Sequence, residues 1–251
     1  MISFFRKIRR KLLTQNRVTR YLVYAIGEII LVTIGILIAL QINTWNEQKK
    51  ASKSEQEILA NLFEDFLYND SILISSLEVK KEALNKNFQI LDYTGNKSKP
   101  ASREEFNALL SYIYTVKPFK PRNGFLDEVL SSGKLGIIQD ANLRNKLSLW
   151  KSILEEMGQA ESSALVLEFK LIDFIMKNGE WLSIDKLSIN PFAQSFPESG
   201  FDVDNRELLN SLEFENLIEN RLIFSDALNL KLEETKDLNE EIIALLQKNM
   251  K

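Results

Sequence analysis

The stretch YLVYAIGEIILVTIGILIALQI, residues 21–42, decides how this chain is organised. It holds a single charged residue, Glu28, among 22 residues. A helix that rises ~1.5 Å per residue would be about 33 Å long over this stretch, which is enough to cross a hydrocarbon core of ~30 Å. A helix is the expected spanning element because it satisfies its own backbone polar groups where water is absent. The sequence therefore predicts a transmembrane helix over residues 21–42.

Composition indicates a folded, mildly acidic domain after this helix. The chain has 251 residues, so residues 43–251 can form a domain with its own hydrophobic core. Hydrophobic residues make up 45% and charged residues 27%, which is typical of a folded protein. The net charge is −3, and the first 20 residues carry seven cations and no acid, which leaves −10 for the rest. We expect no nucleic-acid partner, because phosphate binding requires a basic surface.

Several kinds of catalytic and metal site are excluded by residue type. The chain has no cysteine and no histidine, which excludes disulfides, thiol chemistry, Ser-His-Asp catalysis, the usual zinc sites and the Glu-x-x-His di-iron motif. The Walker, GxGxxG, HExxH and GxSxG motifs do not occur. Adjacent acids such as Glu155 and Glu156 point about 100° apart on a helix, so they do not converge as catalytic pairs do. We therefore expect no enzyme activity, no cofactor and no metal.

The segment before the span, residues 1–20, is basic and amphipathic, with Ile2, Phe5 and Ile8 on one helical face. This pattern is typical of a helix on anionic lipid headgroups, and equally of a charge cluster that sets membrane topology. Seven cations precede the span and three lysines closely follow it, so the positive-inside rule places residues 1–20 in the cytoplasm and the remainder outside it. The residues expected at the membrane interfaces are Arg6, Arg9, Arg10, Arg17, Arg20, Tyr21 and Trp45.

A cleaved signal peptide is the alternative to a permanent anchor. The apolar run of 22 residues is longer than the apolar region of a signal peptide, which has about 7–15 residues. The residues Gln41-Ile42-Asn43 also lack the small side chains of a cleavage site. We therefore expect an uncleaved signal anchor.

Three residues within the span indicate a contact between transmembrane helices. Gly35 and Ala39 form a small-xxx-small pair, which lets two helix backbones approach closely. Glu28 lies on the same helical stripe, where a carboxyl group is costly unless it faces protein, water or headgroups. Two interpretations remain open: a contact between protomers through Glu28, Gly35 and Ala39, or a glutamate that reaches the cytoplasmic headgroups. The first interpretation predicts a homo-oligomer.

Four short motifs resemble a family signature: YAIGEI at 24–29, IGILIALQIN at 34–43, WNE at 45–47 and SSGKL at 131–135. They are similar to an uncharacterised family of single-pass membrane proteins from Gram-negative bacteria, defined as a domain of unknown function. The resemblance implies an anchor in the inner membrane and a periplasmic helical domain. It implies no activity, ligand or catalytic residue for this chain.

Apolar residues recur at three- and four-residue steps, which predicts long helices at about 43–93, 140–178 and 212–249. Ser102, Asp140 and Ser211 are expected to cap helices, and Gly133 to end a short one. The last helix approaches heptad spacing, so we expect it to pair as a coiled coil along the first. The residues expected to be buried are Leu59, Leu62, Phe66, Leu73, Leu77, Leu84, Phe88 and Leu91 in the first helix, Leu143, Leu147, Trp150, Leu154, Leu165, Phe169, Ile172 and Ile175 in the second, and Leu217, Phe224, Leu228, Leu232, Leu238, Ile242 and Leu245 in the third.

Residues 179–203 form an apolar loop by composition, with two glycines, two prolines and the aromatic residues Trp181, Phe192, Phe196 and Phe201. A structureless connection of this length is uncommon and often functional. One interpretation is a lid that seals one end of a bundle. The other is a surface that contacts a ligand or a partner.

The predicted fold class is all-α, with one N-terminal transmembrane helix followed by an elongated helical-bundle domain over residues 43–251. We expect a structural, interaction or scaffold role at the periplasmic face of the inner membrane, with an unknown protein partner. The alternative is a sensor-type helical domain that binds a small ligand near residues 179–203. The predicted cytoplasmic segment, residues 1–20, is too short for an enzymatic transmitter, which favours the first role.

Overall fold

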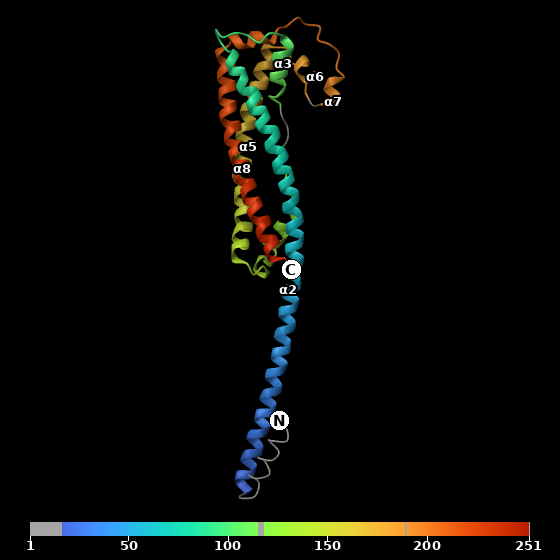
Figure 1. Cartoon of the computed structure of the whole chain (residues 1–251), viewed down its shortest axis with the longest axis vertical. Coiled ribbons are helices and arrows are strands. Elements are labelled where there is room, and N and C mark those ends of the chain that lie inside the picture. The colour runs from blue at the N-terminus through green and yellow to red at the C-terminus, as the bar shows by residue number, and fades with distance from the viewer. Residues whose placement is uncertain (1–16, 115–117, 189, 251) are drawn as a thin grey trace. The chain divides into compact units, whose positions relative to one another are not determined.

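The structure is a computed structural model that describes residues 17–114, 118–188 and 190–250, and most of these residues are helical while none forms a β-strand (Figure 1). The predicted all-α fold class is confirmed for this part of the chain. The chain divides into two compact units, residues 1–56 and 57–251. The sequence predicts other boundaries, with a cytoplasmic segment to residue 20 and a span to residue 42.

The elements follow one another in a simple order. They are α2 (Arg17–Phe88), the 3₁₀ helix η1 (Gln89–Tyr93), α3 (Arg103–Ser111), α4 (Gly124–Ser131), η2 (Lys134–Ile137), α5 (Ala141–Asn178), α6 (Leu182–Lys186), α7 (Pro191–Gln194), η3 (Asn205–Asn210) and α8 (Leu212–Asn249). Helix α2 contributes residues to both units, and the two other long helices, α5 and α8, lie in the second.

In the first unit, α2 exposes the apolar stretch 21–42 along its length. Leu31 is 75% exposed and Ile42 is 61% exposed. Among the described residues, α2 is the helix that is long and apolar enough to cross a membrane, by length and composition. Its exposed apolar surface is compatible with an anchor, because a lipid-facing helix needs no polar face.

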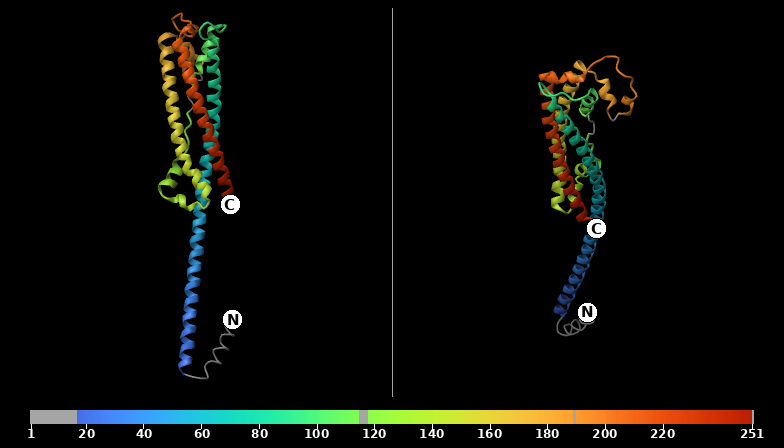
Figure 2. Two further views of the ribbon diagram at one scale, coloured as in Figure 1. Left: turned by 90° about the vertical axis from the view of Figure 1, so that its left-hand side faces the viewer. Right: turned by 45° about the horizontal axis from the view of Figure 1, so that its top comes forward.

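In the second unit, α5 and α8 lie side by side, as the two directions of view in Figures 1 and 2 show. Residues 57–88 of α2 pack against both of them. The ring centroids of Phe66 in α2 and Trp150 in α5 are 5.0 Å apart, and Nδ2 of Asn239 in α8 donates to the carbonyl oxygen of Phe66 at 3.2 Å. The predicted pairing of the last helix with the first long helix is thereby confirmed.

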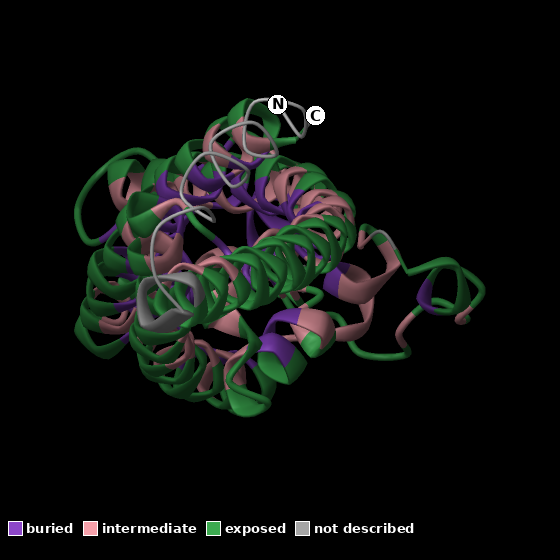
Figure 3. Cartoon of the chain, turned by 90° about the horizontal axis from the view of Figure 1, so that it is seen from below, coloured by how far each residue is buried: buried purple, intermediate pink, exposed green. Residues whose placement is uncertain are grey.

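Two apolar clusters form the interior of this unit, and Figure 3 shows buried residues on the inner faces of the helices. The first apolar cluster includes Phe66, Trp150 and Leu232, together with residues of α4. The second apolar cluster includes Ile90 and Ile175 and is built from η1, α3, α5, α6, η3 and α8. Burial of these side chains supplies the main driving force for packing three long helices together.

The predicted helix caps are present. Backbone N–H groups donate to the side chains of Ser102 (from Glu105, 3.1 Å), Asp140 (from Leu143, 3.0 Å) and Ser211 (from Phe214, 3.3 Å). Gly133 follows α4 with a φ of 71°, a left-handed conformation that favours glycine. Each cap satisfies backbone groups that the helix itself leaves free.

The prediction of burial is wrong for four residues, all of which are exposed: Phe88, Leu165, Phe169 and Phe224. Phe169 lies about 120° around the helix axis from the buried Ile175. Leu171 is buried in that part of α5 instead. A long run of leucine and phenylalanine fits more than one helical stripe, and the positions of α2 and α8 decide which stripe is covered.

The predicted loop at 179–203 contains two short helices, α6 and α7. Asn190 caps α7 by accepting a hydrogen bond from the N–H of Phe192 at 3.0 Å, and Pro191 occupies its first position. Helix α6 packs against α3, and Figure 1 shows α6 and α7 beside that helix. The glycines and prolines of this segment therefore flank or begin short helices, and the segment is not a structureless loop.

Candidate functional site

A pocket of about 240 Å³ lies between the two apolar clusters, where α2, α5 and α8 meet. On α5, for example, the pocket residues Glu161 and Glu168 lie between Met157 of the first apolar cluster and Leu171 of the second. Its lining residues are Lys80, Ala83, Leu84, Pro118, Glu161, Ala164, Leu165, Glu168, Arg221, Ser225, Leu228 and Asn229. We call this the polar pocket.

A buried ion pair forms one part of the polar pocket. Nη2 of Arg221 lies 3.3 Å from Oε2 of Glu168 and also donates to the carbonyl oxygen of Ile113 at 2.7 Å. The side chains of Arg221 and Glu168 are 5% and 14% exposed. Burial lowers the pKa of Arg221 and raises the pKa of Glu168, and in each case the partner's charge opposes the effect of burial. Arginine stays charged under these conditions because its ordinary pKa is so high.

Two further charged residues, Lys80 and Glu161, complete the lining. Burial lowers the pKa of Lys80, and the negative charges of Glu161 and Glu168 act in the opposite direction. In the described part of the chain, neither Lys80 nor Glu161 takes part in a hydrogen bond or in an ion pair within 4.0 Å. The polar pocket thus holds two cations and two carboxyl groups, of which one pair is in contact.

Several buried polar atoms of this site lack partners among the described residues. They are Nε and Nη1 of Arg221 and both Nδ2 and Oδ1 of Asn229. Leaving a buried donor or acceptor without a hydrogen bond costs about 1–3 kcal/mol. A protein interior rarely contains several such atoms together, so the polar pocket is the candidate binding site of this domain.

Charged, amide, hydroxyl and apolar groups share the polar pocket. No group of three or more Asp or Glu residues in the described part of the chain could hold a metal ion. The hydroxyl group of Ser225 is one of the lining groups. Charged and amide groups in a small, partly apolar space can recognise a ligand that carries complementary groups.

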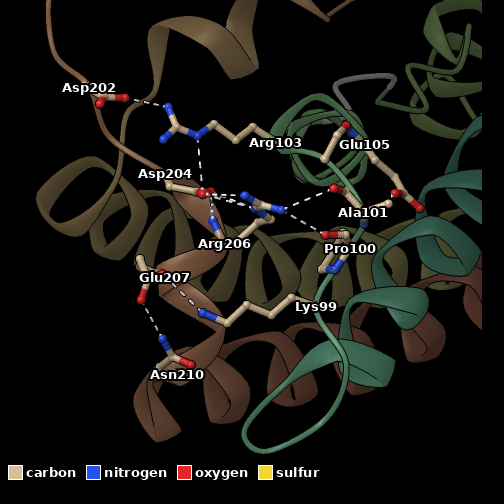
Figure 4. Close-up of polar contacts among 11 residues, drawn as sticks. Lys99, Pro100, Ala101, Arg103, Glu105, Asp202, Asp204, Arg206, Glu207 and Asn210 are labelled. Carbon is tan, nitrogen blue, oxygen red and sulfur yellow. Dashed lines mark hydrogen bonds and ion pairs between the residues drawn. The ribbon is translucent and has the colours of Figure 1, made fainter.

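A second polar cluster, drawn in Figure 4, joins residues 99–105 to residues 202–210. Asp204 accepts from Nε and Nη2 of Arg206, and Nη1 of Arg206 donates to the carbonyl oxygen of Pro100 at 3.1 Å. Arg103 contacts Asp202 at 2.6 Å. Hydrogen bonds from Arg206 lower the pKa of Asp204 to about 2. These contacts connect two surface segments, so we assign this cluster a structural role.

The residues predicted at the membrane interfaces are only partly described. Arg6, Arg9 and Arg10 lie outside the described residues, and Arg17 and Arg20 belong to α2 without a described side chain. Tyr21 and Trp45 are exposed, and Nζ of Lys49 lies 5.4 Å from the ring centroid of Trp45. Their placement at a membrane interface stays a prediction.

The predicted transmembrane contact residues, Glu28, Gly35 and Ala39, are exposed on α2. No atom of the described residues lies within 4 Å of the position that a Cβ atom would occupy on Gly35. A contact between protomers through this surface stays a prediction.

The four aromatic residues predicted for a ligand or partner surface have different environments. Trp181 is partly buried and packs against the second apolar cluster. The rings of Phe192 and Phe196 meet edge to face, with centroids 5.0 Å apart. Phe192 is 70% exposed and Phe201 is 80% exposed. Part of this segment thus seals the bundle, as the lid interpretation predicts, while two of its aromatic rings face outward.

Sequence reasoning missed the polar pocket, although a signal for it exists. Phe214, Arg221 and Leu228 follow one another at steps of seven residues on α8, and Arg221 occupies a position where its heptad neighbours are buried leucine and phenylalanine. Glu168 could not be matched to Arg221 in the same way, because the pairing depends on how α5 and α8 align.

Comparison with known proteins gives one match: residues 28–152 are similar to a family described as "Family of unknown function (DUF6090)". The similarity supports the predicted relationship to an uncharacterised domain family. It includes Lys80 but ends before Glu161, Glu168, Arg221 and Asn229. Neither the curated proteins nor the solved structures gave a match.

Proposed function

We propose that this chain is a membrane-anchored helical interaction protein without enzyme activity or cofactor. The observation that carries the proposal is the apolar segment of α2 over residues 21–42, in which no residue is buried, on the same chain as a well-packed helical domain. Exposed apolar surface of this length is costly in water and favourable in lipid. The absence of histidine and cysteine from the sequence supports a binding role over catalysis.

The proposed location is the inner membrane, with residues 1–20 in the cytoplasm and the helical domain in the periplasm. Seven cations precede the apolar segment and would face anionic headgroups on the cytoplasmic side. Trp45, at the other end of the segment, suits the outer interface, where an amphipathic ring is favoured.

The proposed partner is a protein, either another copy of this chain or a different one, and not nucleic acid. Large apolar side chains are exposed on the outer face of α8, among them Leu212 (71%) and Ile223 (60%). Gly35 and Ala39 offer a further open surface on the anchor. Both surfaces are compatible with association in the plane of a membrane.

Two experiments test this proposal in native membranes. A reporter that is active only in the periplasm, fused after Lys251, should be active, and activity of a cytoplasm-only reporter there would reverse the topology. Crosslinking of the full chain, followed by identification of the captured proteins, should recover one reproducible partner or a dimer of this chain. Recovery of neither, at crosslinking yields that capture a known membrane complex, would contradict the interaction role.

Association through the anchor has its own test. Replacing Gly35 with Ile should separate two helices that approach through Gly35 and Ala39, and Glu28→Gln should be milder because an amide still bonds across helices. Contacts of this kind contribute about 0.6 kcal/mol on average, so a sensitive membrane association assay on the full chain is required. Leu37→Ile is the matched control. Equal association of the wild type, Gly35→Ile and Leu37→Ile would leave Glu28 as an acid that reaches the headgroups.

A second candidate function is a sensor-type domain that binds a small ligand near residues 179–203. The specific observation in its favour is the exposure of Phe192 and Phe201, since such rings are usually covered. Replacing both rings with serine should then abolish a ligand-dependent rise in melting temperature and leave the fold intact. A rise that persists in this double variant would exclude the loop as the binding site.

A further inference from the structure

We infer that the polar pocket binds a small zwitterion with an apolar side chain, of the chemistry and size of a free α-amino acid. This site lies among α2, α5 and α8 and not at the segment 179–203. The inference does not depend on the interaction role proposed above, since a domain can bind a metabolite and a protein on different surfaces.

The charges of the polar pocket favour a ligand that carries both signs. Lys80 and Arg221 supply two cations, and Glu161 and Glu168 supply two carboxyl groups. A ligand with only a negative charge would meet two carboxylates, and one with only a positive charge would meet two cations. A zwitterion can pair its carboxylate with the cations and its ammonium group with the carboxylates, so it leaves no like charges opposed.

The unpaired atoms of the site match the same ligand. Nε and Nη1 of Arg221 are buried donors without an acceptor among the described residues, and a carboxylate, the acceptor that fits the planar guanidinium best, would reach them by displacing a neighbouring side chain. Among the described residues, the buried donor and acceptor of the Asn229 amide have no partner, and Glu161 has no ion-pair partner within 4.0 Å. The ammonium group of an amino acid offers three donors to such acceptors.

Volume and wall chemistry set the size of the ligand. The pocket measures about 240 Å³, which is below the range of about 300–1,000 Å³ typical of sites for drug-sized molecules. Its apolar walls come from Ala83, Leu84, Pro118, Ala164, Leu165 and Leu228. A side chain the size of that of leucine or valine would replace water against these walls.

The test compares three probes on the full-length protein in lipid nanodiscs. The probes are L-leucine, 4-methylpentanoate, which lacks the ammonium group, and 3-methylbutylamine, which lacks the carboxylate. We expect saturable calorimetric binding of leucine, and at least about tenfold weaker binding of each truncated probe, because each loses a charge-assisted hydrogen bond. Alanine, valine, methionine and phenylalanine extend the series to other side-chain sizes.

Two variants of the polar pocket, Ser225→Trp and Glu161→Gln, and one control, Ser162→Trp, locate the binding site. Ser225→Trp should fill the polar pocket and abolish binding, whereas Ser162→Trp, on the exposed face of α5, should bind as the wild type does. Glu161→Gln should weaken binding about tenfold. It is the safer variant, because Glu161 makes no hydrogen bond and no ion pair within 4.0 Å in the described part of the chain, so the fold should survive.

Each outcome of these binding experiments either supports the inference or overturns it. Selective binding of one or more amino acids, lost in Ser225→Trp and weakened in Glu161→Gln, supports the inference. It is overturned if none of the five amino acids binds at millimolar concentration, if 4-methylpentanoate binds as well as leucine, or if binding survives both variants. The crosslinking result for the interaction role is independent of each of these outcomes.

Discussion

The same three helices, α2, α5 and α8, pack in two different ways along their length. At one level Phe66, Trp150 and Leu232 meet in the first apolar cluster, where Phe66 and Trp150 have their rings in contact. At the next level the same helices present Lys80, Glu168 and Arg221 to one another. Apolar packing at the second level would stabilise the bundle more, because buried ion pairs recover little of their desolvation cost.

This difference indicates that the first apolar cluster is optimised for stability and that the polar pocket is not. In the first apolar cluster the polar atom of Trp150 is satisfied, since Nε1 donates to Oδ1 of Asn123 at 3.0 Å. In the polar pocket, atoms of Arg221 and Asn229 have no partner among the described residues. Proteins commonly tolerate such losses at functional sites, which is why we locate the binding function at the second level.

The largest expected effect is at the apolar level. Trp150→Ala removes a side chain that is 1% exposed and should lower the free energy of unfolding by about 3–5 kcal/mol. Denaturant unfolding of the full chain in detergent measures this change. Leu149→Ala, next to it on the exposed face, is the control and should cost no more than ~0.5 kcal/mol. Similar losses for the two variants would contradict the apolar core described here.

At the polar level, removing one charge should matter more than removing both. Glu168→Leu leaves Arg221 buried without its carboxylate and should lower the free energy of unfolding by about 3 kcal/mol. Adding Arg221→Met should restore most of this loss, because neither member of the buried Arg221–Glu168 pair is then left without its partner. Glu156→Leu, which breaks an exposed ion pair with Lys231 on the same two helices, should cost at most ~1 kcal/mol. Equal costs for the single and double variants would show that the pair is not desolvated.

Asn229→Leu should stabilise the protein. Both polar atoms of this buried amide lack partners, so leucine of similar volume should raise the free energy of unfolding by about 1–2 kcal/mol. Asn239→Leu is the matched variant on the same helix, and it should lower the free energy by about 1 kcal/mol because Asn239 bonds to the carbonyl oxygen of Phe66. A loss of stability in Asn229→Leu would mean that its amide is satisfied in solution.

The smallest effect is expected at the surface cluster around Asp204. The folded-state pKa of Asp204 is about 2 and its ordinary value is 3.8, so its stabilising effect is present above pH 3.8 and is lost as the pH falls through about 2. Asp204→Asn should therefore be less stable than the wild type at neutral pH, by about 1 kcal/mol, and equal to it in strong acid. Thermal unfolding across this pH range measures the difference. Asp202→Asn, whose side chain is 88% exposed, is the control and should change the stability at neutral pH by no more than ~0.5 kcal/mol.

Helical periodicity predicted much of the fold from the sequence. The long helices at Ala141–Asn178 and Leu212–Asn249 follow the three- and four-residue spacing of leucine, and Asp140 and Ser211 cap them as local chemistry requires. The apolar segment 21–42 is recognisable as a candidate transmembrane helix, because an apolar run of this length is uncommon in other structures. Local rules of this kind need no knowledge of the neighbouring elements.

The exposure of individual apolar residues was harder to predict. Phe169 and Leu165 belong to a helical stripe as regular as that of Leu171, yet they are exposed and Leu171 is buried. The segment 179–203 looked like a loop because α6 and α7 are too short for periodicity to be visible. Burial depends on which side of a helix its neighbours occupy, and that is a property of the packed bundle.

The sequence by itself determined the helical class, the apolar segment, the helix caps and the exclusion of histidine and cysteine chemistry, because each depends on residue type or on spacing along one helix. Only the tertiary structure decided that Lys80, Glu168 and Arg221 share a pocket. These residues are far apart in the chain, and each alone resembles an ordinary surface charge. Their proximity follows from the alignment of three separate helices, which side-chain packing across the whole bundle fixes.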